Sequence, residues 1–259
     1  MAQRFCASNL IQEIQRPRCL SDPAAYNSHM KILILIFTLL TQPAIEITAE
    51  PDHHLTLENT QVRVFNVEVP SGTETHTHWH RHDYVYVAIG ASTIVNSVEG
   101  KPQSTLQLAD GETRFSPGPF AHAVRTVSQT PFRNITIEIL QDEKLHHTPS
   151  PWKEIRGLDI LDHGTKEILF VQDAIRATQF DLQPHAAAPI QTHPRPVLLI
   201  ATADEELFLD DPRTHSPREP QAPLIHLKSG ETTWLGNGFL HPIVNASDHT
   251  AKFITLEFP

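Results

Sequence analysis

The chain has 259 residues, with 20 Lys or Arg against 30 Asp or Glu, so its formal net charge is −10 and its pI is near 5.9. This balance argues against a protein that follows nucleic-acid phosphates, because such proteins need a basic face. Charged residues make up only 19% of the chain and hydrophobic residues 39%, which excludes a disordered protein, and the 21 Pro predict many turns in place of long helices.

A segment typical of a secretory signal peptide begins at Met30. Lys31 gives it a positive start, the apolar run 32–40 follows, and a polar stretch ends at Ala49. A membrane-spanning helix needs about 20 apolar residues, more than this run provides. We predict that translation starts at Met30, that residues 1–49 are an upstream extension plus a signal peptide, and that the mature protein is secreted or periplasmic. An uncleaved anchor or a buried core segment is the alternative.

The rest of the chain consists of two copies of one unit. Val62-Arg63 recurs as Ile175-Arg176, 113 residues later. After an insertion of six residues in the second copy the offset is 119, and it relates Gly111-Glu112-Thr113 to Gly230-Glu231-Thr232. Each copy has the size of one domain. We therefore predict an N-terminal domain at residues 50–148 and a C-terminal domain at residues 149–259.

Short runs in which apolar and polar residues alternate follow one another along each copy, among them 62–69, 84–89 and 134–139. Gly, Pro and Asp interrupt these runs at intervals of roughly ten residues. This spacing is typical of an antiparallel β-sandwich or barrel, and no stretch after residue 49 has the pattern of an amphipathic helix. The sequence therefore predicts an all-β protein.

Four of the 17 His occupy alternate positions in the segment from His76 to His82. On a strand they would project from one face, and neutral imidazole is the commonest nitrogen ligand for Zn, Fe, Mn, Ni or Cu. The alternative is a solvent-facing, His-rich edge strand. Asp83 follows at the same parity as the apolar positions after it, so we expect a buried carboxylate that needs a cation or hydrogen-bond donors around it.

A fifth histidine, His122, stands at the start of a predicted strand. It follows the turn Pro117-Gly118-Pro119, which is unlike the setting of a core histidine. If His122 joins His78 and His80, the result is a site of three nitrogens and one carboxylate with open coordination positions.

At these residues the chain resembles the cupins. The first cupin motif reads Gly72, five residues, His78-Trp79-His80, two residues, Asp83, six residues, Gly90. The second reads Gly111, five residues, Pro117-Gly118-Pro119, two residues, His122, three residues, Thr126, and in the second copy Gly230, five residues, Gly236-Asn237-Gly238, two residues, His241, three residues, Asn245. The resemblance covers both copies and implies a bicupin, with two jelly-roll β-barrels in tandem.

The resemblance implies His78, His80 and His122 as metal ligands, with Asp83 in the place of the family's Glu. The gap between His80 and Asp83 is one residue shorter than in the family. A rival register, His76-x-His78, restores that gap and loses the leading Gly, so His76 or His82 remains an alternative ligand.

The second copy lacks this set of ligands. The matching positions hold Gln191, His193, Pro196 and His241. We therefore predict one divalent transition-metal ion per chain (Fe, Mn, Ni, Zn or Cu), bound in the first copy.

The family resemblance also implies a metal-dependent dioxygenase or isomerase acting on a small organic acid or phenol, although it assigns no catalytic residue. The first copy is similar to the small single-domain cupins linked to β-alanine degradation. A non-catalytic module that binds a metal or a small ligand is the alternative. We expect a small-molecule partner, no nucleic acid and no membrane after signal cleavage, and we leave open whether the protein forms a homodimer. The expected apolar wall of the site consists of Trp79, Tyr84, Tyr86, Phe115 and Phe120.

Overall fold

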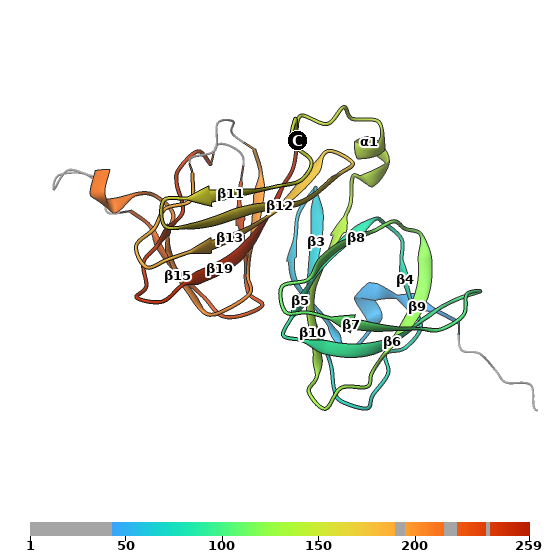
Figure 1. Ribbon diagram of the computed structural model, residues 1–259. Helices are drawn as coiled ribbons and strands as arrows, with labels where there is room; N and C mark the ends of the chain where they lie inside the picture. Colours follow the sequence, from blue (N-terminus) through green and yellow to red (C-terminus); the bar gives the residue numbers. More distant parts are fainter. Residues whose placement is uncertain (1–42, 190–194, 215–221, 237–238) are drawn as a thin grey trace, which may run out of the picture. The chain divides into compact units, whose positions relative to one another are not determined.

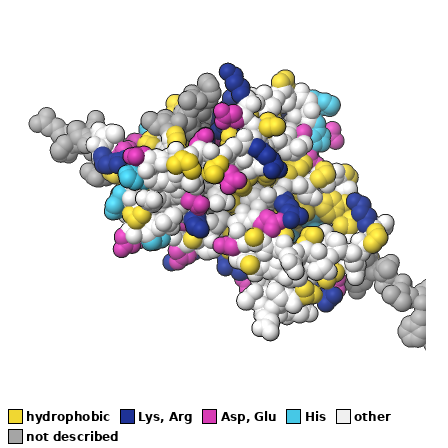
Figure 2. All heavy atoms as spheres, viewed as in Figure 1, with side chains coloured by type: hydrophobic (Ala, Val, Ile, Leu, Met, Phe, Trp, Pro, Cys, Tyr) yellow, Lys and Arg dark blue, Asp and Glu magenta, His cyan; other side chains and the backbone are white. Residues whose placement is uncertain are grey.

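The computed structural model describes residues 43–189, 195–214, 222–236 and 239–259. Most of the predicted leader, including Met30, lies outside the described residues. Within them, no helix is both long and apolar enough to cross a membrane. Figure 2 shows that Lys and Arg side chains on one face are interspersed with Asp and Glu, with no large area of one sign.

Two five-stranded sheets build the N-terminal barrel. Its strands are β1 (Ile45–Glu46), β2 (His53–Glu58), β3 (Val62–Val69), β4 (His78–His80), β5 (Tyr84–Ile89), β6 (Ser92–Val98), β7 (Ser104–Leu108), β8 (Thr113–Ser116), β9 (Phe120–Thr126) and β10 (Phe132–Ile139). One sheet has the order β1-β4-β9-β6-β7 and the other β2-β3-β10-β5-β8. Figure 1 shows these strands, coloured from blue to green, curving around one interior.

The C-terminal barrel follows a short helix, α1 (Asp142–His146). Its strands are β11 (Gly157–Leu161), β12 (Gly164–Gln172), β13 (Ile175–Leu182), β14 (Val197–Ala201), β15 (Glu205–Phe208), β16 (Leu224–Leu227), β17 (Thr232–Leu235), β18 (Val244–Asn245) and β19 (Ala251–Glu257). They form one sheet of the order β11-β12-β13-β19-β14-β17 and one of the order β16-β15-β18. The predicted fold, two tandem jelly-roll barrels in an all-β protein, is confirmed (Figure 1).

The sequence repeat corresponds to equivalent strands. β3 begins at Val62 and β13 at Ile175, which are the first residues of the matching segments. β10 pairs antiparallel with β3, and β19 pairs antiparallel with β13, so the final strand of each copy lies beside the same partner.

Strand β10 shows how the alternation of side chains sets up the interior of the first barrel. Its three isoleucines, from Ile135 to Ile139, pack in a buried cluster with the valines of β5. Asn134, Thr136 and Glu138 are also buried but project from the opposite face, because neighbouring side chains on a strand alternate. Asn134 and Thr136 line a cavity inside the barrel. A polar face of this kind is expected for a binding site and not for a packing core.

The first barrel begins before the predicted boundary at residue 50. β1 pairs in parallel with β4, with Ile45 opposite His78. Ile47 is only 2% exposed and belongs to the hydrophobic cluster that includes Phe65. The alternating sequence Ile45-Glu46-Ile47, which we interpreted as the end of a signal peptide, therefore forms part of the barrel. Cleavage after Ala49 would remove this part.

Candidate metal centre

Two neighbouring strands place three histidines on one interior face. Alternation along β4 turns His78 and His80 inward and Trp79 outward, where the Arg81 guanidinium lies 4.3 Å above the indole ring. β4 pairs antiparallel with β9, and His78 stands directly opposite His122. The register of one strand pair therefore brings the three predicted nitrogen ligands together.

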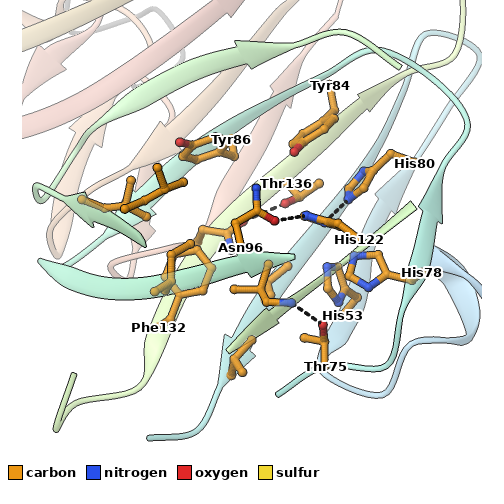
Figure 3. Close-up of a pocket in the computed structure, with 17 residues that line it drawn as sticks. His53, Thr75, His78, His80, Tyr84, Tyr86, Asn96, His122, Phe132 and Thr136 are labelled. Atoms are coloured by element: carbon orange, nitrogen blue, oxygen red, sulfur yellow. Dashed lines mark hydrogen bonds between the residues drawn. The ribbon is translucent and has the colours of Figure 1, made fainter. Parts of the chain in front are cut away.

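The three imidazoles form a compact, buried group. His78, His80 and His122 are 0%, 1% and 7% exposed. One nitrogen from each ring lies within 4.8 Å of those from the other two, and the Nε2 atoms of His80 and His122 are 3.1 Å apart. Figure 3 shows the three rings directed toward one another at one end of the cavity.

Hydrogen bonds behind two of the rings fix their tautomers. Nδ1–H of His78 donates to the carbonyl oxygen of His76 (2.9 Å), and Nδ1–H of His122 donates to Oδ1 of Asn96 (2.8 Å). In both rings the lone pair is therefore on Nε2. Nε2 of His78 is buried and has no hydrogen-bond partner, which is unusual for a buried nitrogen. A divalent transition-metal ion fits this arrangement, since it would bind the unpaired lone pair of His78 and take the place of the hydrogen bond between Nε2 of His80 and Nε2 of His122.

The pKa values favour the form of imidazole that binds metal. Burial lowers the pKa of His78 to about 4, and the neighbouring His53 adds to this shift. Burial also lowers the pKa of His80 and His122 well below the usual value, and a second imidazole nearby contributes in each case. All three rings are therefore neutral at neutral pH and keep a lone pair for an ion.

The structure does not bring Asp83 to the three imidazoles. Its Oδ1 accepts a hydrogen bond from the backbone N–H of Gly118 (2.8 Å), and its Oδ2 lies 2.7 Å from Nε2 of His146. Asp83 shares the parity of Val85 and Val87, and these valines pack in the cluster outside the cavity. The sequence parity correctly predicts that Asp83 is buried beside hydrogen-bond donors. Asp83 nevertheless shares the side of the outer valine cluster, which is turned away from the ligands.

His76 and His82 also lie apart from the group. The His76 side chain is 58% exposed, and Nδ1 of His82 is 3.2 Å from a carboxylate oxygen of Asp142. β4 contains only three residues, so the alternation that would align four histidines ends on both sides of it. This arrangement favours the pair His78-x-His80 over the rival register.

A fourth imidazole that sequence reasoning missed lies beside the group. His53, on β2, has its ring 4.6 Å from that of His78. Its Nδ1–H donates to Oε2 of Glu50 (2.7 Å), and both side chains are buried. His53 matches no cupin motif, so its only signal was a histidine at the start of an alternating run.

Two further polar side chains stand behind the ligands. Asn96, on β6, holds His122 as described above. Glu138, on β10, lies with Oε1 4.0 Å from Nδ1 of His80. Burial raises the pKa of Glu138, and the Arg63 guanidinium opposes that shift. Neither residue belongs to the quoted motifs, because each reaches the site from a strand distant in sequence.

The imidazoles open into a cavity of about 60 Å³. Its lining residues are His53, Val67, Val69, Thr75, His78, His80, Tyr84, Tyr86, Ile94, Asn96, Leu106, Leu108, His122, Val124, Phe132, Asn134 and Thr136. None of these described lining residues is Lys, Arg, Asp or Glu. Tyr84 stacks on His80 with ring centroids 4.1 Å apart, and burial raises its pKa.

The aromatic wall differs in part from the prediction. Tyr84 and Tyr86 line the cavity as expected. Trp79 faces away from it, and Phe115 packs against the outer cluster. Phe120 stacks on His80 at 5.5 Å without lining the cavity.

The described part of the C-terminal barrel has fewer possible metal ligands close together than the N-terminal barrel. Gln191 and His193 lie outside the described residues. The side chain of His241 is 57% exposed, and its Nδ1 is 3.2 Å from an Asp210 oxygen. In the described part of this barrel, no three His, Cys, Asp or Glu come close enough together to hold a metal by themselves.

Comparisons with known proteins show the fold. Models of known protein families give no match, and no curated protein matches the chain. Among solved structures, the Lactobacillus farciminis oxalate decarboxylase formate complex is similar with a TM-score of 0.55 and 11% identity, covering 80% of this chain and 83% of that one. AerE from Microcystis aeruginosa gives 0.52 and 10%, covering 81% and 98%. A Bacillus subtilis oxalate decarboxylase variant gives 0.51 and 12%, covering 80% and 75%.

These neighbours have the cupin fold, and the chain shares that jelly-roll fold. Within a barrel of this fold, the three buried imidazoles form a group that could hold a metal ion.

Proposed function

We propose that the N-terminal barrel binds one divalent transition-metal ion through Nε2 of His78, His80 and His122. The observation that carries this proposal is the set of three buried, neutral imidazoles whose nitrogens converge, one of them without any hydrogen-bond partner. The C-terminal barrel, with an exposed His241, binds none. The expected stoichiometry is one ion per chain.

We further propose that this centre is catalytic, as a metal-dependent dioxygenase or isomerase. A bound ion would supply a Lewis acid, or a binding site for dioxygen, at its open positions. His53 can accept and return a proton at Nε2, since its Nδ1–H is held by Glu50. The Val, Ile, Leu and Phe side chains of the lining would limit the access of water to the reacting group. The small cavity favours a small organic acid over a phenol.

The relatives support the choice of metals to test. Bacillus subtilis oxalate decarboxylase is described with Mn(II) centres, so Mn²⁺ belongs in the first trial beside Fe²⁺, Zn²⁺, Ni²⁺ and Cu²⁺. Because no Lys or Arg is among the described lining residues, the ion would be the main positive charge available to a carboxylate substrate.

The remaining proposals concern the whole chain. We infer a bicupin whose first barrel is related to the small cupins linked to β-alanine degradation. We also infer export to the periplasm or the exterior. Because β1 is part of the barrel, a cleavage site before Ile45 fits this inference better than one after Ala49.

A non-catalytic metal or small-ligand binding module is the second candidate. It is favoured by the degenerate C-terminal barrel, whereas the Glu50–His53 pair beside the ligands favours an enzyme. Turnover, or dioxygen uptake in a panel of small organic acids, separates the two candidates.

The experiment that tests metal binding is elemental analysis of the purified chain before and after loading with each metal. His78→Ala and His122→Ala should abolish binding, and the matched control His76→Ala should retain it. If His76→Ala empties the site while His80→Ala does not, the ligand set is wrong. A second tightly held ion that is lost in His241→Ala would contradict the assignment of the C-terminal barrel.

A further inference from the structure

A buried carboxylate, that of Glu138, stands behind His80, the one proposed ligand whose Nδ1 has no hydrogen-bond partner. Glu138 is 1% exposed, and its Oε1 has no hydrogen-bond partner. Nδ1 of His80, 4.0 Å away, is also buried and unpartnered. Two unsatisfied buried polar atoms that face each other are uncommon, because each loses its hydration without gaining a hydrogen bond.

The other two ligands show what His80 lacks. His78 donates its Nδ1–H to a backbone carbonyl, and His122 donates its own to Asn96. These bonds leave Nε2 free of a proton in both rings. Nε2 of His80 lies 3.1 Å from the unprotonated Nε2 of His122 and therefore carries the ring proton in this structure. Binding of an ion through Nε2 of His80 moves that proton to Nδ1, and the Nδ1–H then needs an acceptor. Oε1 of Glu138, 4.0 Å from Nδ1, is a buried acceptor without a partner.

We propose that Glu138 is a positioning residue, which accepts the Nδ1–H of His80 and so holds Nε2 of that ring ready for the ion. The inference rests on the proposed metal site. The two atoms are 4.0 Å apart and need to approach by about 1 Å to reach hydrogen-bond distance. A carboxylate in this place also makes the imidazole a stronger donor to the metal.

A purely structural role for Glu138 has its own support. Oε2 of Glu138 lies 3.3 Å from the guanidinium of Arg63. The repeat relates Arg63 to Arg176 and Glu138 to Glu257, and these two residues also form an ion pair in the C-terminal barrel. The ion pair is therefore common to both barrels. The feature described only in the first barrel is the imidazole in front of the second carboxylate oxygen.

The equivalence of the Arg63–Glu138 and Arg176–Glu257 ion pairs provides control variants. Glu138→Leu removes the acceptor, and Glu138→Gln replaces it with a weaker one of the same shape. Arg63→Gln breaks the ion pair but keeps the carboxylate, and Glu257→Gln breaks the equivalent pair in the other barrel. The affinity of each full-length variant for Zn²⁺ and Mn²⁺ is measured by competition with a chelator, and its melting temperature is measured without metal.

We expect Glu138→Leu to lower the affinity by about 10–100-fold, with a smaller loss for Glu138→Gln. Arg63→Gln and Glu257→Gln should lose thermal stability and keep the affinity within about twofold. In Zn²⁺-loaded wild-type protein the Nδ1 proton of His80 should be visible in histidine-ring ¹H–¹⁵N spectra, and in Glu138→Gln it should exchange faster. Glu138→Gln and the histidine-ring spectra test the inference even if Glu138→Leu does not fold.

Equal affinity of wild type and Glu138→Gln, with an unchanged His80 signal, would overturn the inference. So would an equal loss of affinity in Arg63→Gln. If the wild type itself binds neither metal, the metal site fails, and that outcome is distinct from failure of the role of Glu138.

Discussion

Replacing Ile47 by Ala should cost the N-terminal barrel about 2–5 kcal/mol of unfolding free energy. Ile47 is 2% exposed and packs in the cluster with Phe65, Val67 and Ile94. Burial of the whole side chain contributes about 1.5–3 kcal/mol, and the cavity left by truncation adds to the loss. The matched control is Ile155→Ala, because that side chain is 65% exposed and should cost less than about 0.5 kcal/mol.

The assay is urea unfolding followed by circular dichroism, with the transition of each barrel fitted separately. A chain that starts at Glu50 should lose at least as much stability as Ile47→Ala, since it also lacks the β1–β4 pairing, whereas one that starts at Gln42 should match the full chain. A loss below about 1 kcal/mol in both Ile47→Ala and the shorter chain would refute the reasoning, and Ala49 would again be an acceptable end of the leader.

Three further results are expected. Between pH 6.5 and about 4 the unfolded chain binds a proton at His78 that the folded metal-free chain does not, so His78 alone should contribute about 3 kcal/mol to the fall in stability with pH. His80 and His122, whose pKa values are also lowered, add to that fall. pH-dependent urea unfolding of wild type and His78→Gln measures the share of His78, and an equal slope in both would contradict it. Asp83→Asn should keep metal affinity within a few-fold but lose about 1–3 kcal/mol, because Asp83 binds Gly118 and His146 instead of the ion; a chelator titration that shows complete loss of metal would restore Asp83 as a ligand. Asn96→Ala should weaken metal binding by about 10–100-fold by removing the acceptor of the His122 Nδ1–H, and unchanged affinity in the same titration would argue against it.

The sequence was sufficient for the fold, because period-two alternation and the repeat are both local or nearly local signals. β3 and β13 begin at the residues that the repeat aligned, Val62 and Ile175. The spacing His78-x-His80 implied one strand face, and the turn before His122 implied a strand start. The structure places these three histidines together.

What the sequence missed depends on contacts between distant strands. The alternation along a strand tells which residues share a face, but not which face meets the ligands. Asp83 was therefore predicted on the ligand side and lies on the other. His53 and Glu138 reach the site from β2 and β10, and no spacing along the chain predicts that arrangement. The pattern Ile45-Glu46-Ile47 has the same polarity as the end of a signal peptide, so composition alone does not reveal that β1 is a strand.

The parallel pairing of β1 with β4 places the beginning of the described chain beside one of the proposed ligands, since Ile45 is the partner of His78. Any ion that stabilises β4 also favours the docked form of β1, because the two share backbone hydrogen bonds. The reverse holds with the same coupling free energy: detachment of β1 must weaken the hold on the ion. If the barrel holds the proposed ion, docking of β1 and metal binding form a single linked equilibrium, in which protection of residues 45–49 from proteolysis reports how much metal is bound.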